Sequence, residues 1–173
     1  MAQLAGGDDL ALNPLVRRWR ERLAGFLYQM TADRGTALDL TQETFVRLYR
    51  SRGRYQPTAA FSSYLFTIAA NLARDHARWR SRHPSVPLEE RTAAALHDKT
   101  AAPDRAAMNR EEVAAMDAAI ATLPSTLREA LLLFVYEDLG YSEIAAIVGC
   151  SPKAVETRIY RARQQLKSVL SRH

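Results

Sequence analysis

The sequence predicts an all-α protein of two small helical domains joined by a flexible linker. Apolar residues recur at spacings of three and four along most of the chain, and no stretch shows the sustained alternation of a half-buried strand. A segment rich in Pro, Ala and charge divides the 173 residues. We expect a flexible N-terminus over 1–11, a first domain over 12–82, a linker over 83–107 and a second domain over 108–173.

The first domain is predicted to contain three amphipathic helices. Apolar side chains share one helical face over 12–30 and again over 39–50. Gly53 and Pro57 then interrupt the pattern, and a third periodic stretch runs from about 62 to 79. Together these helices form the first domain.

The second domain ends in the pattern of a helix-turn-helix. A short helix over 141–148 is followed by a turn at Gly149 and Cys150 and then by a longer helix. Gly149 can take the positive φ that a helix terminus needs. Ser151 can cap the next helix, and Pro152 suits its first position.

Positive charge is concentrated within the chain, whose formal net charge is +5. Residues 152–173 hold six Lys and Arg side chains against the single acid Glu156, and a second cluster of four arginines lies within 74–82. On a helical wheel Lys153, Thr157 and Arg161 lie opposite the apolar face. A solvated amphipathic helix would show the same periodicity, but the helix-turn-helix pattern and the local charge favour DNA binding.

Catalysis and metal binding find little support in the sequence. Asp39 and Glu43 share a helical face, which suits acid–base chemistry or a solvated surface, but no third catalytic group accompanies them. Cys150 is the only cysteine, so no internal disulfide can form, and the four His show no metal-ligand spacing with it. We predict no enzymatic activity, cofactor or metal. Cys150 is either a small packing residue or a redox sensor.

The N-terminus lacks the pattern of a signal peptide, and no apolar stretch approaches the ~20 residues of a membrane-spanning helix. We therefore expect a cytoplasmic protein with no direct membrane insertion.

Three segments resemble those of the extracytoplasmic-function (ECF) sigma factors, in the sigma-70 family of bacterial RNA polymerase subunits. They are "DLTQETFVRLYR" (39–50), "FSSYLFTIAANLARDHARWR" (61–80) and "LPSTLREALLLFVYEDLGYSEIAAIVGCSPKAVETRIYRARQQL" (123–166). The resemblance implies a sigma-2-like domain that binds the β′ clamp helices of core polymerase and opens the promoter −10 element. It also implies a sigma-4-like domain that recognises the −35 element and docks on the β flap, and an anti-sigma factor, often membrane-anchored.

The resemblance implies three sets of contact residues. The core polymerase set is Asp39, Gln42, Glu43 and Arg47. The −10 DNA set, in which aromatic and basic groups would hold unpaired bases, is Tyr55, Phe61, Asn71, Arg74, Arg78, Arg80 and Arg82. The −35 DNA set is Ser151, Lys153, Glu156, Thr157, Arg158 and Arg161.

Some of these side chains have a second interpretation. Phe61 and Tyr64 have the spacing of core aromatics, and Trp79 could stack on a base or cover the edge of the domain. Glu156 could accept a hydrogen bond from cytosine N4 or pair locally with Lys153 or Tyr160.

Two other classes of protein compete with the sigma factor. One is a stand-alone, LuxR-like helix-turn-helix regulator, which would bind duplex DNA without polymerase. The other is a small helical enzyme or adaptor in which the basic helix is incidental.

Overall fold

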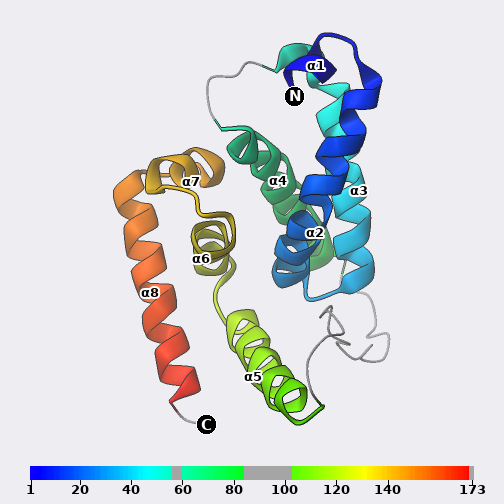
Figure 1. The fold of residues 1–173 in the computed structure, drawn as a ribbon. Helices are drawn as coiled ribbons and strands as arrows, with labels where there is room; N and C mark the ends of the chain where they lie inside the picture. Colours follow the sequence, from blue (N-terminus) through cyan, green and yellow to red (C-terminus); the bar gives the residue numbers. More distant parts are fainter. Residues whose placement is uncertain (56–59, 84–102, 172–173) are drawn as a thin grey trace.

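The computed structural model confirms the all-α, two-domain class (Figure 1). It describes residues 1–55, 60–83 and 103–171, and every regular element within these ranges is helical. The first domain contains α1 (Ala2–Ala5), η1 (Asp9–Ala11), α2 (Leu12–Thr31), α3 (Arg34–Arg50), η2 (Arg52–Arg54) and α4 (Phe61–Arg82). The second contains α5 (Pro103–Ala121), α6 (Ser125–Glu137), α7 (Tyr141–Val148) and α8 (Pro152–Leu170).

Local chemistry explains where the helices of the first domain begin and end. Ala32 takes a left-handed conformation with φ 54° and ends α2. The side chain of Asp33 then accepts a hydrogen bond of 2.7 Å from the backbone N–H of Thr36, which caps α3. Because of this cap, α3 begins at Arg34, before the stretch of 39–50 that the apolar spacing predicted.

The N-terminus is not the flexible segment that the sequence suggested. Its first residues form α1, and Leu4 on that helix is fully buried. The α1 helix lies beside η1 and η2, so the first residues belong to the packed domain.

The linker expected over 83–107 overlaps α5 at its C-terminal end. Helix α5 begins at Pro103, and proline favours the first position of a helix because its missing N–H would have no intrahelical partner there. The expected linker residues 84–102 lie outside the described part of the chain.

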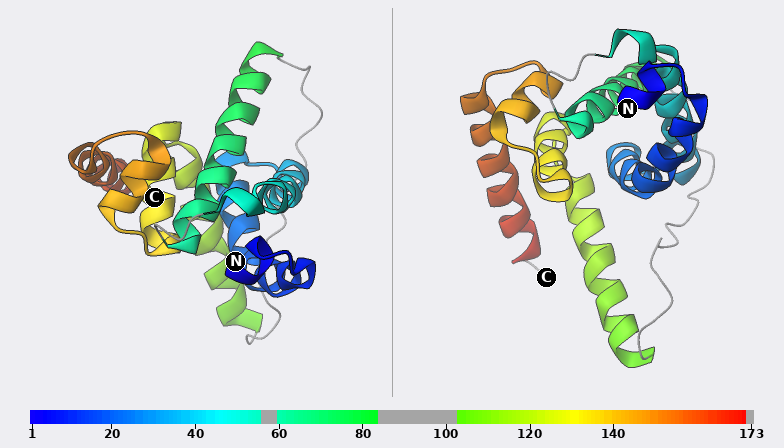
Figure 2. Two further views of the ribbon diagram at one scale, coloured as in Figure 1. Left: turned by 90° about the horizontal axis from the view of Figure 1, so that it is seen from above. Right: turned by 45° about the horizontal axis from the view of Figure 1, so that its top comes forward.

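The buried apolar side chains form one cluster that extends through both domains. In the first domain Phe66 packs edge-to-face on Trp19 and Phe26, with ring centroids 6.3 Å and 5.3 Å away. In the second domain, α6, α7 and α8 enclose residues such as Leu132 and Ile159. The domains meet where α6 packs on α2 and α7 packs on α4 (Figures 1 and 2). The two domains therefore pack directly against one another.

Candidate nucleic-acid interface

The helix-turn-helix has the geometry that its sequence predicts. Gly149 has φ 69°, and its N–H donates to the carbonyl of Ala145 at 2.9 Å, which ends α7. The Ser151 hydroxyl accepts a hydrogen bond of 3.2 Å from the N–H of Ala154 and caps α8. Cys150 lies between them, is half-buried and packs against the core, which agrees with the role of a small packing residue.

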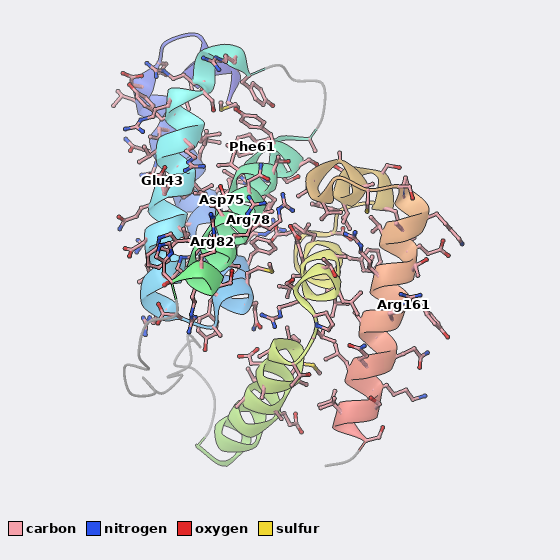
Figure 3. All side chains as sticks on the ribbon, turned by 180° about the vertical axis from the view of Figure 1, so that it is seen from behind. Glu43, Phe61, Asp75, Arg78, Arg82 and Arg161 are labelled. Atoms are coloured by element: carbon pink, nitrogen blue, oxygen red, sulfur yellow. The ribbon has the colours of Figure 1, made fainter. Side chains whose placement is uncertain are left out.

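Helix α8 presents a polar face away from the core. Val155, Ile159 and Ala162 are buried beneath it, whereas Lys153 and Arg161 are exposed. Figure 3 shows Arg161 on the outer side of α8, away from α4. The apolar side of α8 therefore fixes the helix on its domain and leaves the opposite side accessible to a DNA groove.

Besides Ser151, three members of the expected −35 set have partners within the protein. Lys153 Nζ lies 2.8 Å from Glu156 Oε2, so Glu156 adopts the local pairing. The hydrogen bond and the charge of Glu156 raise the pKa of Lys153. The Thr157 hydroxyl donates to the carbonyl of Lys153 at 2.9 Å, and Arg158 is half-buried on the flank of the helix.

The C-terminal half of α4 carries an exposed basic segment. Arg78 pairs with Asp75 on the same helix, and Arg80 and Arg82 are exposed. Figure 3 shows Asp75, Arg78 and Arg82 following one another along this helix. The Trp79 ring, which is also exposed, stacks on His83 with a centroid distance of 5.0 Å, so it does not cover the core.

The aromatic residues at the start of α4 are packed. Phe61 is half-buried and meets Trp19 edge-to-face at 5.7 Å. The Tyr64 hydroxyl lies 2.7 Å from the hydroxyl of Ser51, and its ring contacts that of Tyr55 at 5.2 Å. Both Phe61 and Tyr64 thus adopt the packing alternative.

An open pocket of about 410 Å³ lies where α3, η2 and α4 meet. It is lined by Arg47, Arg50, Ser51, Arg54, Tyr64, Ile68 and Asn71. Sequence reasoning placed Asn71 in the −10 set and Arg47 in the polymerase set, but it missed Arg50 and Arg54. Their signal was present in the basic run "RSRGR" at 50–54. The middle arginine, Arg52, instead lies over the Tyr49 ring at 3.8 Å.

The expected polymerase-binding residues share the outer side of α3. Asp39, Gln42 and Arg47 are exposed, and Glu43 is half-exposed and visible on α3 in Figure 3. Arg47 Nε lies 2.8 Å from Glu43 Oε1, a spacing of four that stabilises the helix and fixes both side chains.

Arg74, a half-buried member of the −10 set, contacts the second domain. Its Nη1 lies 2.6 Å from Glu129 Oε1 on α6, and its Nη2 donates to Asn71 Oδ1 at 2.5 Å. Burial raises the pKa of Glu129, and the positive charges of Arg74 and Arg158 oppose that rise. Arg74 therefore connects the two domains.

Among the described residues, no group of three or more His, Cys, Asp and Glu side chains could hold a metal ion. None of the helices in the described ranges is long and apolar enough to cross a membrane.

Together, a basic helix-turn-helix and a second, arginine-lined helical domain define a two-domain DNA-binding protein. Comparison with known families makes the class specific: residues 15–83 match sigma-70 region 2, and residues 114–166 match sigma-70, region 4. The chain belongs to the sigma-70 family, as an ECF sigma factor. Sigma factors are DNA-binding transcription initiation factors rather than enzymes.

Individual relatives support this assignment. The chain is 34% identical to the RNA polymerase sigma-H factor of Pseudomonas aeruginosa, over 95% of this chain and 88% of the relative. It is 35% identical to the RNA polymerase sigma factor CarQ of Myxococcus xanthus, over 98% and 95% of the two chains. The match of the first domain to region 2 leaves the stand-alone regulator without support.

Solved structures share the fold. CnrH, in complex with the cytosolic domain of CnrY, is 30% identical with a TM-score of 0.74, over 98% of this chain and 94% of CnrH. RpoE of Bartonella quintana, in complex with the anti-sigma factor NepR, has a TM-score of 0.76 at 23% identity, over 92% of this chain and 96% of RpoE.

Proposed function

We propose that this ECF sigma factor binds core RNA polymerase, directs it to a subset of promoters and helps to melt the −10 element, while polymerase performs the chemistry. The observation that carries the proposal is that one chain contains both region 2 and region 4, each with its own basic surface. A protein that only bound duplex DNA would need region 4 alone.

In this proposal α8 recognises the −35 element. Arg161 is exposed on the polar side of the helix, where a guanidinium can donate two hydrogen bonds to a guanine edge. Lys153 lies near the N-terminus of α8, where it would contact a phosphate after releasing Glu156. The pair is exposed and water screens its attraction, so DNA can displace it.

The arginine-lined pocket would hold an unpaired base of the −10 strand. Arg50 and Arg54 at its rim would neutralise the flanking phosphates, and the Tyr64 ring offers an aromatic wall. Asn71 can donate and accept hydrogen bonds with a base edge. Arg78, Arg80 and Arg82 extend the positive surface along α4 toward the adjoining backbone.

The exposed side of α3 would bind the β′ clamp helices through Asp39, Gln42, Glu43 and Arg47. Apolar surface of the second domain would dock on the β flap; Val135, which is exposed at the end of α6, is one such residue. We place this activity in the cytoplasm because that is where bacterial polymerase meets promoters.

An anti-sigma factor controls ECF factors of this kind. CnrH was solved in complex with the cytosolic domain of CnrY, and the Bartonella quintana RpoE in complex with the anti-sigma factor NepR. We propose that the partner of this chain is anchored in the membrane and releases the sigma factor on a signal from outside the cell.

Run-off transcription with core polymerase on a library of genomic fragments tests the function. We expect promoter-specific transcripts that depend on this protein. Arg161→Ala should lower the discrimination between a cognate and a scrambled −35 sequence by about 1–3 kcal/mol.

Arg163→Ala is the matched control, because Arg163 lies on the same helix but stacks over the Phe134 ring at 5.2 Å. Absence of any promoter-specific transcript would refute the function. Equal effects of the two variants would refute only the role of Arg161.

A further inference from the structure

The N-terminal segment, residues 1–11, packs close to the arginine-lined pocket. Helix α1 contacts both η1 and η2. In Figure 1 α1 lies beside the end of α3 that leads into η2. Leu4 on α1 is fully buried, so an apolar side chain attaches the segment to the domain. The segment therefore lies against the short helix that supplies part of the pocket.

The local fold of the segment brings Asp9 close to η2. Gly7 has φ 97°, a left-handed conformation that suits glycine, and the chain turns there between α1 and η1. The Asp8 side chain accepts a hydrogen bond of 3.1 Å from the N–H of Leu10 and caps η1. Asp9 is the first residue of η1, and its Oδ1 lies 3.6 Å from Arg52 Nε.

Arg52, the first residue of η2, has a second set of contacts. Its guanidinium group lies over the Tyr49 ring, and its Nη1 donates to the carbonyl of Tyr49 at 3.0 Å. Asp9 contacts Tyr49 as well, and this hydrogen bond raises the pKa of the phenol. Asp9, Tyr49 and Arg52 therefore form one cluster that joins the N-terminal segment to η2.

The η2 helix depends on such contacts because it is short. A helix of a single turn is not stable by itself in water. Ser51 and Arg54, on either side of Arg52 in the chain, both line the pocket. The Ser51 hydroxyl also lies 2.7 Å from that of Tyr64, the aromatic wall. A displacement of η2 would therefore change the rim of the pocket and one of its walls.

We propose that the N-terminal segment positions the arginine-lined pocket, with Asp9 and the buried Leu4 as its two anchors, and thereby determines how well the pocket discriminates among unpaired −10 bases. This inference rests on the proposed function. Asp9 and Leu4 are positioning residues, because the residues that line the pocket include neither of them.

Loss of the Asp9 carboxylate would affect bases and phosphates differently. Arg52 would lose a neutralising partner, so more positive charge would be available to the DNA backbone. The pocket would lose a support, and selective recognition requires groups that are held in place. We therefore expect weaker discrimination among bases with no loss of overall affinity.

Selection from a pool of forked DNA tests the inference. Each DNA carries the −35 duplex of a promoter found by run-off transcription and a randomised single-stranded −10 segment. Core polymerase loaded with this protein selects the molecules that it binds, and sequencing gives the base preference at each position. We expect Asp9→Asn to lower the preference at one −10 position at least about fivefold, the lower end of what stacking of one base contributes. Total binding should not fall, and Asp9→Glu should retain the preference.

Two exposed residues supply matched controls. Glu21→Gln on α2 makes the same change in net charge as Asp9→Asn, and Leu10, which is 76% exposed, makes Leu10→Ala the counterpart of Leu4→Ala. Leu4→Ala should lower the preference as Asp9→Asn does, whereas neither control should. The Asp9 side chain is 59% exposed, so Asp9→Asn decides the test if Leu4→Ala does not fold.

Hydrogen–deuterium exchange of the free protein gives a measurement that is independent of DNA. The amides of residues 50–55 should exchange at least about fivefold faster in Asp9→Asn than in Glu21→Gln, because η2 loses an anchor. Unchanged exchange would overturn the inference. A −10 preference that Asp9→Asn and Glu21→Gln affect equally would also overturn it.

The two measurements separate this inference from the proposed function. A −10 preference in the unmodified protein that Asp9→Asn leaves intact would refute the positioning role alone. An unmodified protein with no −10 preference, together with faster exchange in Asp9→Asn, would refute the proposed function, while the support of η2 by the N-terminal segment would stand.

Discussion

Glu156 is an acid in the second turn of the basic helix α8, and its side chain pairs with Lys153. The two side chains are 48% and 82% exposed, so water screens their attraction and the pair contributes little to stability. It does, however, cancel one positive charge on the side of α8 that would face DNA. The position of Glu156 therefore affects DNA affinity more than folding.

Replacing this acid should strengthen DNA binding. Glu156→Gln releases Lys153 for a phosphate, so we expect tighter binding to duplex DNA and a salt dependence steeper by about one unit in log K against log salt. Fluorescence anisotropy across a range of salt concentrations measures both quantities. Glu112→Gln, at an exposed site on α5, makes the same change in net charge. If both variants shifted affinity equally, the pairing with Lys153 would be irrelevant.

At the scale of single elements, the turn between α7 and α8 requires glycine at position 149 because of the backbone conformation there, and not because a side chain would lack room. Gly149 has φ 69°, and a Cβ placed on it would have no atom within 4 Å apart from those of Gly149 itself and its two neighbours in the chain. Gly25 has equal room, but it lies within α2. Adding one methyl group should therefore have opposite effects at the two sites.

We expect Gly149→Ala to lower the free energy of unfolding by about 1 kcal/mol, because an L side chain is disfavoured in the left-handed region. Gly25→Ala should raise it by roughly 0.5–1 kcal/mol, since alanine is the better helix former. Urea denaturation of the two variants provides the comparison. Shifts of the same sign would contradict this account of the turn.

Most elements could be predicted from the sequence because their signals are local. Ser151 and Pro152 marked the start of α8, and the structure confirms it. The early start of α3 was missed because the apolar spacing fades before residue 39, and only the cap at Asp33 indicates it. The role of Leu4 could not be predicted, since its burial depends on residues far along the chain.

The candidate site was predictable to a similar extent. A helical wheel sufficed to place Lys153 and Arg161 on the polar side of α8. It could not show that Arg74 faces a carboxylate 55 positions away, because that contact depends on how the domains pack. The arginine-lined pocket likewise appears only when α3 and α4 are brought together.

At the scale of the whole molecule, packing of α6 on α2 also places an acid in an unusual environment. The Glu137 side chain is 1% exposed, and Arg22 Nη2 lies 3.0 Å from its Oε2. Burial raises the pKa of Glu137 to about 7 from an ordinary value of 4.5, and the charge of Arg22 opposes the rise. The folded protein therefore keeps a proton on Glu137 that the unfolded chain would lose.

Stability should consequently depend on pH through this one group. Between pH 4.5 and about 7 the unfolded state binds fewer protons at Glu137, so the free energy of unfolding should fall as pH rises. The total loss is at most about 3 kcal/mol, and above this window the contribution is constant. Urea denaturation from pH 5 to 8 should show a flatter profile for Glu137→Gln than for the unmodified protein. Parallel profiles would contradict the assignment.

The internal ion pairs also bear on how the protein finds its partners in the cell. A bacterial chromosome offers about 10⁶ or more nonspecific sites, and a chain with net charge +5 is attracted to all of them. Glu129 pairs with Arg74 and Glu156 pairs with Lys153, so these two cations are partly neutralised within the protein. The two ion pairs therefore weaken nonspecific binding to the chromosome. A larger share of the protein then remains available to polymerase.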